Sequence, residues 1–366
     1  MDDNTGAGLM SSMCAPNRRF FIAAAIGFLA TPSFLGATQL ADESSLPFAG
    51  TDIIAVLQAD GRERQFGGRI EDIRGETLTL RRNGKSKIEL YRMPSVTSLY
   101  FAKPAEWDKG LEHIESGEFR RGLEYLDKAL RAEKRQWAWN ELQASAAQTC
   151  IKIGRRKEAV ERIEKVFEED ERSRHVSILP LVWDSRLPDD ERIDCEIEQL
   201  GDKSILRRLV ACSALLHKKE LRTSIQKQLT EIRRNSGLVR ISELAESQLW
   251  RIYLLENDNK KPLLNHWCDL VNQMPPTSRG GPAFVLGRLQ AKAHKYDDAA
   301  LSFLWMPTMS PIDQALSAQS LFQASQCLRN AGRVREAENL KHELQSRFPE
   351  TSAALQNNEP EHSTSR

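Results

Sequence analysis

The chain of 366 residues carries almost no net charge, because 52 Lys and Arg residues nearly cancel 51 Asp and Glu residues. Such a balance supplies no broad electrostatic field that would attract nucleic acid or an anionic membrane. The basic runs at 81–87 and 155–157 are offset by nearby acids. We therefore expect no nucleic-acid partner, and recognition must rest on local surface.

Motifs that carry catalytic chemistry are also missing. The sequence contains no G-x-S-x-G, Walker or G-x-G-x-x-G element. Clustered acids at 168–170 and at Asp189 and Asp190 are typical of solvated or helix-capping groups. In the stretch 266–269, the His and Cys two residues apart point to different sides of a helix, which argues against zinc. We expect no enzyme, cofactor or metal site, and a hydrolase using Asp189 or Asp190 is the least favoured alternative.

Cysteine is sparse and never closely spaced, so neither zinc nor dithiol redox chemistry is indicated. We interpret these residues mostly as small buried hydrophobic groups. Five remain if the leader described next is removed, and an odd number leaves at least one unpaired within the chain. The cysteines are Cys14, Cys150, Cys195, Cys212, Cys268 and Cys327.

A single unbroken apolar run, residues 20–30, stands near the amino terminus behind Arg18 and Arg19. It is about half the roughly 20 residues that cross a bilayer as a helix. The order of charged, apolar and small residues predicts a signal peptide over 1–37, cleaved after Ala37, and a linker over 38–49. We expect a periplasmic or otherwise exported protein without a stable membrane span. The twin-arginine and the general secretory routes both stay open.

Residues 50–102 read as short strands separated by turn glycines, with apolar and polar residues alternating most clearly at 76–80. Asn83-Gly84 is the strongest hairpin signal, because both residues tolerate the positive φ angles of a two-residue turn. Five such strands predict a small closed β-barrel, similar to SH3-like or Sm-like folds. The predicted strands are 52–57, 65–73, 76–82, 87–92 and 96–101.

From residue 104 the period becomes helical up to residue 349, and the polar remainder, 350–366, is expected to be a disordered tail. Prolines interrupt the pattern near 178–190, and 274–282 is a loop by composition. Two further, less regular hairpins are expected between these breaks, at 203–234 and 238–273. The predicted hairpins join 106–116 with 119–132, 137–153 with 157–169, 283–293 with 297–305, and 313–330 with 334–347.

Two of these hairpins share the sequence G-R-x-x-E-A, which begins at Gly154 and again at Gly332. The glycine suits the turn between two antiparallel helices, and the alanine suits close helix contact. Small residues also recur twelve positions apart in the first and second helices. These pairs are Gly110 and Gly122, Ala147 and Ala159, Gly287 and Ala299, and Ser325 and Ala337, with Cys212 and Ser224 keeping the same spacing in the irregular middle.

This pattern resembles the tetratricopeptide repeat, a family of helical hairpins stacked into a solenoid. The last repeat matches at Ser325, Ala337 and Pro349. The earlier repeats match at Gly287, Tyr296, Ala299 and Phe303, and at Gly110, Gly117, Phe119 and Ala129, although Gly122 stands where alanine is usual.

The resemblance implies a mainly α protein whose curved helical surface binds proteins or peptides. We therefore expect an exported scaffold or adaptor at the cell envelope, with a protein partner. The alternative is an accessory protein that binds a cell-wall or polysaccharide ligand through the β domain.

Overall fold

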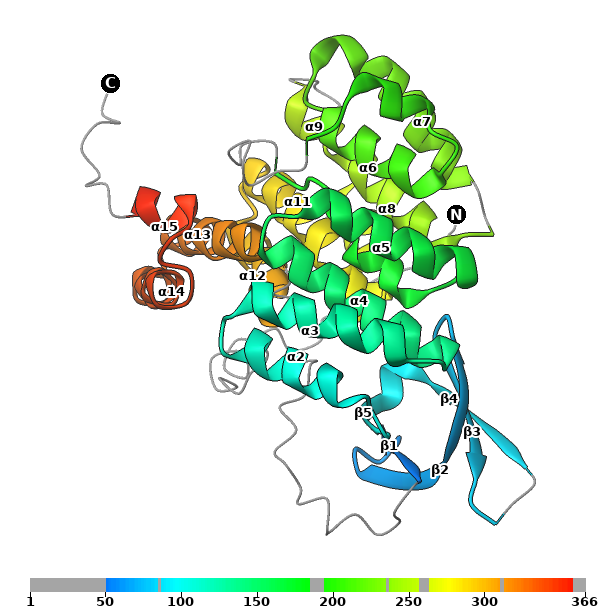
Figure 1. Ribbon diagram of the computed structural model, residues 1–366. Helices are drawn as coiled ribbons and strands as arrows, with labels where there is room; N and C mark the ends of the chain where they lie inside the picture. The colour runs from blue at the N-terminus through cyan, green and yellow to red at the C-terminus, as the bar shows by residue number, and fades with distance from the viewer. Residues whose placement is uncertain are drawn as a thin grey trace, which may run out of the picture. The chain divides into compact units, whose positions relative to one another are not determined.

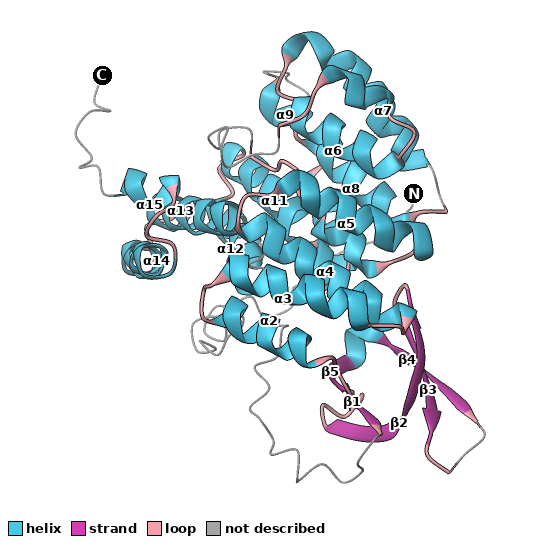
Figure 2. Cartoon of the chain, viewed as in Figure 1, coloured by secondary structure: helices cyan, strands magenta, loops and turns pink. Residues whose placement is uncertain are grey.

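The computed structural model of the chain describes residues 51–84, 87–184, 194–234, 237–256, 263–309 and 313–357. This part is mainly helical, with one small antiparallel sheet formed by its first residues (Figures 1 and 2). The expected signal peptide and linker, and the carboxyl end of the expected tail, lie outside the described residues. Within the described residues, no helix is both long and apolar enough to cross a bilayer.

The sheet follows the predicted strands to within one or two residues. Its strands are β1 (Asp52–Leu57), β2 (Glu63–Arg74), β3 (Thr77–Arg82), β4 (Ile88–Arg92) and β5 (Val96–Tyr100). They lie in the order β4-β3-β2-β1-β5, and every neighbouring pair is antiparallel. Glycines in the turns between these strands, Gly61, Gly75 and Gly84, all adopt positive φ angles, as the sequence predicts for Gly84.

The sheet does not close, so the expected β-barrel is wrong. β4 pairs with β3 and β5 pairs with β1, and the two outer strands do not pair with each other. The apolar face of the sheet packs on helices instead. β2 contacts α4 (Gln136–Lys152), and Phe101, just after β5, lies edge-on to Trp107 of α2 (Ala105–Glu115) and to Trp137 of α4. A sheet whose face is buried in this way needs no closure to shield it from water.

Four helical hairpins form where the sequence pattern predicts them. α2 (Ala105–Glu115) pairs with α3 (Phe119–Ala132), and α4 (Gln136–Lys152) pairs with α5 (Arg156–Glu169). Later in the chain, α11 (Gly280–Lys292) pairs with α12 (Tyr296–Met309), and α13 (Gln314–Asn330) pairs with α14 (Val334–Arg347). Consecutive hairpins also pack together, through α3 with α4 and α12 with α13.

The four hairpins share one turn geometry. In each turn, one residue at positive φ follows the first helix, and its N–H and the next N–H donate to the carbonyls three and five positions back. These two backbone hydrogen bonds cap the carboxyl end of the first helix. Glycine adopts the positive φ angle that they require without strain. The positive-φ residues are Gly117, Gly154, His294 and Gly332.

The G-R-x-x-E-A motif has a physical role at each position. After Gly332 ends one helix, Arg333 precedes the next helix and donates from Nη2 to Glu336 Oε1 at 2.6 Å. Glu336 sits in the first turn, where a carboxylate also favours the helix dipole. Ala337 is fully buried at the helix contact. The motif thus turns the chain, begins the second helix and keeps that helix close to the first.

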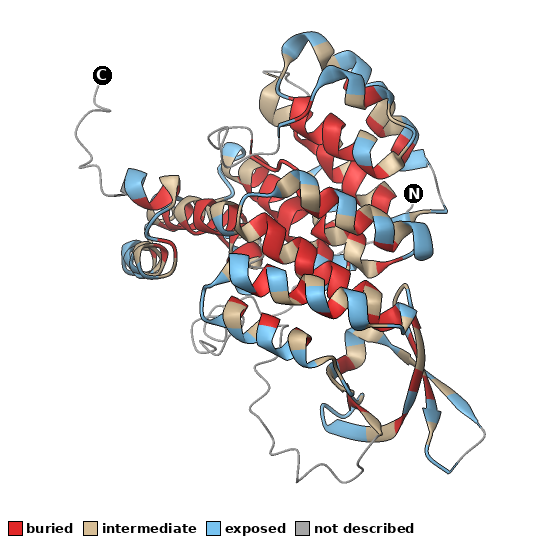
Figure 3. Cartoon of the chain, viewed as in Figure 1, coloured by how far each residue is buried: buried red, intermediate tan, exposed pale blue. Residues whose placement is uncertain are grey.

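The middle of the chain departs from regular hairpins. Its helices are α6 (Ile205–Leu215), α7 (Arg222–Arg234), α8 (Val239–Trp250), α9 (Ile252–Leu255) and α10 (Leu264–Gln273), with short 3₁₀ turns η3 (Arg174–Ile178), η5 (Ile197–Gly201), η6 (Lys219–Leu221) and η7 (Pro276–Ser278). α11 is buried along most of its length, as α4 is (Figure 3). A helix that is apolar around most of its circumference must be surrounded by other elements.

A segment without regular secondary structure, residues 179–184, runs through this interior, and we call it the strap. All six of its residues are buried. Val182 N–H donates to Ser213 Oγ in α6 at 2.8 Å, and the same hydroxyl donates back to the Val182 carbonyl at 3.1 Å. Asp184 Oδ1 accepts from Arg288 in α11 at 2.8 Å. The strap therefore fills space between helices that a simple stack of hairpins would leave open.

The strap is anchored on its amino-terminal side by Glu141 in α4. Both carboxylate oxygens accept from Arg174 Nη2 at 2.7 Å, and Oε1 lies 3.1 Å from His175 Nε2. Burial alone raises the pKa of Glu141, but the charges and hydrogen bonds of Arg174 and His175 outweigh it and lower this pKa to about 2. The ionised carboxylate thus holds η3 against α4.

Helices distant in sequence also bond to the sheet. The Gly75 N–H donates to Asp170 Oδ2 at 2.6 Å, and Glu76 pairs with Arg240 at the start of α8. At the other end of the helical part, Arg156 Nη1 donates to Asp313 Oδ2 at 3.0 Å, which joins α5 to α13. These contacts link the β domain and the two groups of hairpins into one body, instead of a series of units that meet only their neighbours.

Two predicted boundaries are wrong. α11 begins at Gly280, within the expected loop 274–282, because Pro282 falls in its first turn, where no N–H is needed. The expected disordered tail contains a short helix, α15 (Ser352–Asn357). Ala353 and Ala354 of α15 are buried against Phe348 and the first turns of α13. Two small apolar residues were enough to dock this turn of helix.

Candidate functional site

One face of α12 carries apolar side chains that the core does not bury. Leu301 and Met309 are 48% and 37% exposed, and Leu304 and Trp305 between them are partly exposed. Residues spaced by three, four and eight positions lie on the same side of a helix, so these four form a line. We call Leu301, Leu304, Trp305 and Met309 the α12 stripe.

Comparison of the hairpins shows that the stripe is peculiar to α12. The buried small residues of the second helices, Gly122, Ala159, Ala299 and Ala337, set a common register. Two positions after them, the other three hairpins carry exposed polar residues where α12 carries Leu301. Six and ten positions after them, charged side chains or one alanine stand where α12 carries Trp305 and Met309. In the other three hairpins, the residues two positions after the register are Glu124, Glu161 and Asn339. Those six positions after it are Lys128, Lys165 and Glu343, and those ten positions after it are Ala132, Glu169 and Arg347.

The opposite face of α12 fixes its position. Ala299 meets α11 at Gly287, where an added Cβ would lie 3.1 Å from the Ala299 carbonyl oxygen. Phe303 is fully buried, and its ring lies edge-on to Phe284 at 5.4 Å between centroids. Ala300 and Met306 complete this buried side. Leu301 and Met309 are therefore surplus to the apolar contacts that hold α12 in the fold, whereas Leu304 and Trp305 also pack in part against the core.

Trp305 is held in one orientation by the turn before α11. Its Nε1–H donates to the Pro276 carbonyl at 3.3 Å, and the Arg279 guanidinium lies 4.9 Å from the centre of its rings. Arg279 is itself fixed by bonds from Nη2 to the Asn272 carbonyl at 2.7 Å and from Nε to the Met274 carbonyl at 2.5 Å. The stripe thus has a rigid aromatic centre with a positive charge at its side, as anchors of protein interfaces do.

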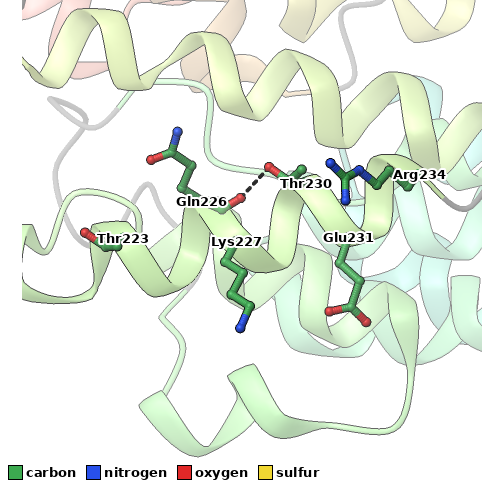
Figure 4. A pocket seen from close by; sticks show the side chains of 6 residues that line it. All are labelled: Thr223, Gln226, Lys227, Thr230, Glu231 and Arg234. Carbon is green, nitrogen blue, oxygen red and sulfur yellow. Dashed lines mark hydrogen bonds between the residues drawn. The ribbon is translucent and has the colours of Figure 1, made fainter.

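A hollow of about 480 Å³ lies along α7 and has a different character (Figure 4). All its lining side chains come from this helix, and they are polar and carry both signs of charge. They are Thr223, Gln226, Lys227, Thr230, Glu231 and Arg234. Thr230 Oγ1 donates to the Gln226 carbonyl, 2.7 Å away, and Figure 4 shows the long side chains spread apart from one another. Groups that do not converge form no preorganised catalytic or ligand site.

A second cavity, about 50 Å³, lies beside the strap, between α4, α8, α11, α12 and the start of α13. It has room for one or two water molecules and is lined mostly by apolar groups, including Leu181, Trp183 and Met306. This part of the helical region therefore offers no groove that would accept a polypeptide.

The residues predicted to pack the repeats lie at helix contacts, with two exceptions. Gly110 and Gly122 meet directly, since a Cβ on Gly122 would lie 2.9 Å from the Gly110 carbonyl oxygen. Fully buried positions are Ala129, Ala147, Ala159, Ala299, Ser325 and Ala337, and Gly287 is also buried. Pro349 is exposed just after α14, and Ser224 of the irregular pair is exposed as well.

The groups considered for catalysis or metal binding have structural roles or do not converge. Asp170 follows α5 and accepts from the N–H groups of Gly75 in a turn of the sheet and of Arg172 in the next loop, so its role is structural although it caps no helix start. Asp189 and Asp190 lie outside the described residues. Among the residues that the structure describes, no three His, Cys, Asp or Glu side chains gather as metal ligands would, and His266 is exposed while its neighbour Trp267 is buried.

The cysteines of the described residues are all free thiols, and four of them are buried. Burial raises the pKa of Cys150 and Cys212 to about 12, and that of Cys195 and Cys327 to about 11. A thiol is nucleophilic only as its thiolate, so these four are chemically quiet near neutral pH. The interpretation of the cysteines as mostly buried hydrophobic groups is confirmed.

Comparison of the chain with known proteins identifies no family to which it belongs. No protein-family model matches the chain, and no curated protein matches it either. The α12 stripe, which the sequence analysis missed, is thus identified from the structure alone. A signal for it does exist in the sequence, because the segment 299–309 carries apolar residues on more than one helical face.

Proposed function

We propose that this chain is an adaptor without enzyme activity, which binds another protein through the α12 stripe. The observation that carries the proposal is the exposure of apolar residues at positions where the other hairpins carry polar ones. Transfer of such side chains out of water is worth about 25 cal/mol per Å² of apolar surface. Partly exposed apolar residues gathered around a fixed tryptophan are typical of protein-binding surfaces.

A tetratricopeptide-like solenoid is the architecture that we propose for the hairpins. It is supported by the four turns of one geometry, by the small residues at the contacts between paired helices, and by the packing of consecutive hairpins. The sheet and the strap join distant hairpins, so the proposed solenoid is braced. A braced solenoid would offer a fixed outer face, and we place the working surface there, on α12.

We propose an amphipathic helix as the bound segment. The stripe runs from Leu301 to Met309, eight residue steps or about 12 Å at 1.5 Å per step, which corresponds to about two turns of a partner helix. Leucine, methionine and tryptophan side chains suit the apolar face of such a helix. The guanidinium of Arg279 beside Trp305 favours a partner carboxylate at the edge of the contact.

Site-specific photocrosslinking tests the proposal. A photoreactive residue at position 301 is expected to capture a defined protein from an envelope fraction, whereas the same residue at 161, its equivalent on α5, is expected to capture none. The captured protein is then purified and titrated against the wild type, Leu301→Glu and the control Glu161→Gln. We expect affinity at least about tenfold weaker for Leu301→Glu alone, since tenfold is 1.4 kcal/mol. Equal capture from both positions, or unchanged affinity of Leu301→Glu, would contradict the proposal.

We propose that the adaptor acts in the cell envelope, on the strength of the leader pattern at 1–37. Fractionation with amino-terminal sequencing checks this, and the expected result is a periplasmic protein that begins near Thr38. A soluble cytoplasmic protein with Arg18 and Arg19 intact would contradict it. The alternative, an accessory protein that binds cell-wall polysaccharide through the β domain, is favoured by no contact that we describe. Retention on cell-wall material without a protein partner would support it.

A further inference from the structure

β4 forms one edge of the sheet. All five residues of β4 are at least partly exposed. Ile88 and Leu90 point to the same side and are 44% and 69% exposed, and Leu90 is the most exposed of the large apolar side chains that the structure describes. The ladder bonds β4 to β3 on one side, and among the described residues no strand pairs with its other side.

β5, the strand at the other edge, is followed by residues that are packed against helices. Phe101 lies edge-on to Trp107 and Trp137, with ring centroids 5.3 and 4.9 Å away, and Arg135 Nη2 donates to the Ala102 carbonyl at 2.7 Å. Apolar side chains at an unprotected edge invite a further strand. The two edges of this sheet therefore differ, and β4 is the edge at which a further strand would add.

We propose that the added strand is β4 of a second copy of this chain, in an antiparallel pair whose twofold axis passes through Leu90. In this register Leu90 faces Leu90 of the second copy, and Ile88 faces the aliphatic part of Arg92. On the other side of the sheet, Glu89 faces Tyr91. The first two pairs bring apolar groups together, and the third sets a carboxylate against a tyrosine hydroxyl. Such cross-strand pairs stabilise a sheet.

The charges of β4 select this register. A shift by one residue puts side chains of opposite faces against each other. A shift of the axis to Glu89 opposes two carboxylates, and a shift to Arg92 opposes two guanidinium groups, both of which are unfavourable. With the axis at Tyr91, Ile88 meets Pro94, which has no N–H and lies in the 3₁₀ turn Met93–Ser95. Of the four axes compared, the one at Leu90 keeps the ladder and avoids like charges.

The inner face of β4 is already arranged for such a pair. Glu89 Oε2 accepts from the Tyr91 hydroxyl at 2.6 Å and from Arg82 Nη1 at 3.3 Å, so its charge is compensated before a second copy arrives. Two strands of five residues cover less than the roughly 1,000 Å² that marks a stable interface. The dimer is therefore reversible and forms as the protein concentration rises. The dimer would present two α12 stripes. The proposal of a dimer does not depend on the function proposed for the α12 stripe.

Disulfide cross-linking of the purified protein tests the register. Under mild oxidation, Leu90→Cys is expected to form a covalent dimer. Thr79→Cys, which stands opposite Leu90 on β3 and faces the same side, is expected to stay monomeric. Ile88→Cys mixed with Arg92→Cys is expected to form a mixed dimer, while neither variant cross-links to itself. Wild-type protein provides the background from the native thiols. Absence of the Leu90→Cys dimer, or equal cross-linking of Thr79→Cys, overturns the proposal.

Sedimentation velocity gives an independent measurement without new cysteines. The wild type is expected to show a sedimentation coefficient that rises with concentration, and Leu90→Lys is expected to remain monomeric with an unchanged circular dichroism spectrum. Leu90 is exposed, so this substitution leaves the fold intact. A wild type that stays monomeric at every concentration, or a dimer that survives Leu90→Lys, overturns the proposal.

Discussion

Gly281 offers the sharpest test of the packing around the strap. It lies in the first turn of α11, and an added Cβ would fall among the atoms of the Trp183 indole, well inside contact distance. The indole cannot retreat easily, because its neighbours in the strap are fixed. Val182 is bonded to Ser213 through both its N–H and its carbonyl, and Asp184 is bonded to Arg288. Gly281→Ala must therefore displace the ring.

Two opposing effects set the expected size of the change. Alanine in place of glycine favours a helix by about 1 kcal/mol. Trp183 is only 9% exposed, and loss of the contacts of a buried aromatic side chain costs about 3 to 5 kcal/mol. The clash is the larger effect, so Gly281→Ala is expected to lower the free energy of unfolding by about 2 to 4 kcal/mol.

Urea unfolding of a double-mutant cycle measures this effect directly. In a Trp183→Leu background the smaller side chain leaves room for the new methyl group, so Gly281→Ala is expected to cost little or to stabilise. The two substitutions should therefore couple by about 2 kcal/mol or more, within the range of residues in direct contact. Gly201→Ala is the matched control, since no atom lies near its added Cβ. An equal loss in both backgrounds, or no loss in the wild type, would refute the reasoning.

Three further predictions follow from the turns, the buried carboxylate and the thiols. Gly332→Ala should lower the free energy of unfolding by about 1 to 2 kcal/mol, because a residue with a Cβ is strained in left-handed backbone. His294→Gly removes that strain and should raise the free energy of unfolding by less than about 1 kcal/mol. Urea unfolding measures both changes. The pKa of Glu141 falls from 4.5 to about 2 on folding, so its contribution of about 3 kcal/mol is present above pH 4.5 and is lost as the pH falls toward 2. Glu141→Gln should remove this acid dependence, and a difference between the two proteins that stays constant with pH would contradict the assignment. Thiol titration near pH 8 of the folded protein, with Cys14 removed, should label Cys268 alone, and rapid labelling of the other four would show that they are not buried.

The hairpins and strands could be predicted because their signals are local. A glycine at the turn, a small residue in the second helix and a helical period all occur within about forty residues of sequence, and the structure places all eight predicted hairpin helices. Even the turn without glycine, at His294, keeps the same backbone bonds. This consistency arises because the helix contact selects the turn, and glycine only makes that turn easier to form.

The failures have the opposite origin, since each depends on contacts between distant parts of the chain. Barrel closure depends on what covers the inner face of the sheet, and helices such as α2 and α4 cover it here. The strap is stabilised by Ser213 and Arg288, which lie 31 and 104 positions away from their partners in it. α15 docks through Ala353 and Ala354, a pair too weak to stand out in a polar tail. None of these contacts leaves a periodic trace in the sequence.

The α12 stripe lies between these two cases. In a helix of a hairpin, one apolar face suffices for packing, and in α12 the buried face is filled by Ala299, Ala300, Phe303 and Met306. Leu301 and Met309 then have no place in the core, although a sequence pattern alone assigns every apolar residue of a helix to the core. The surplus becomes visible only when the equivalent positions of the other hairpins are seen to be polar. In a fold built from similar hairpins, each hairpin can thus be compared with the others at equivalent positions, and the hairpin that differs is the one to test for binding.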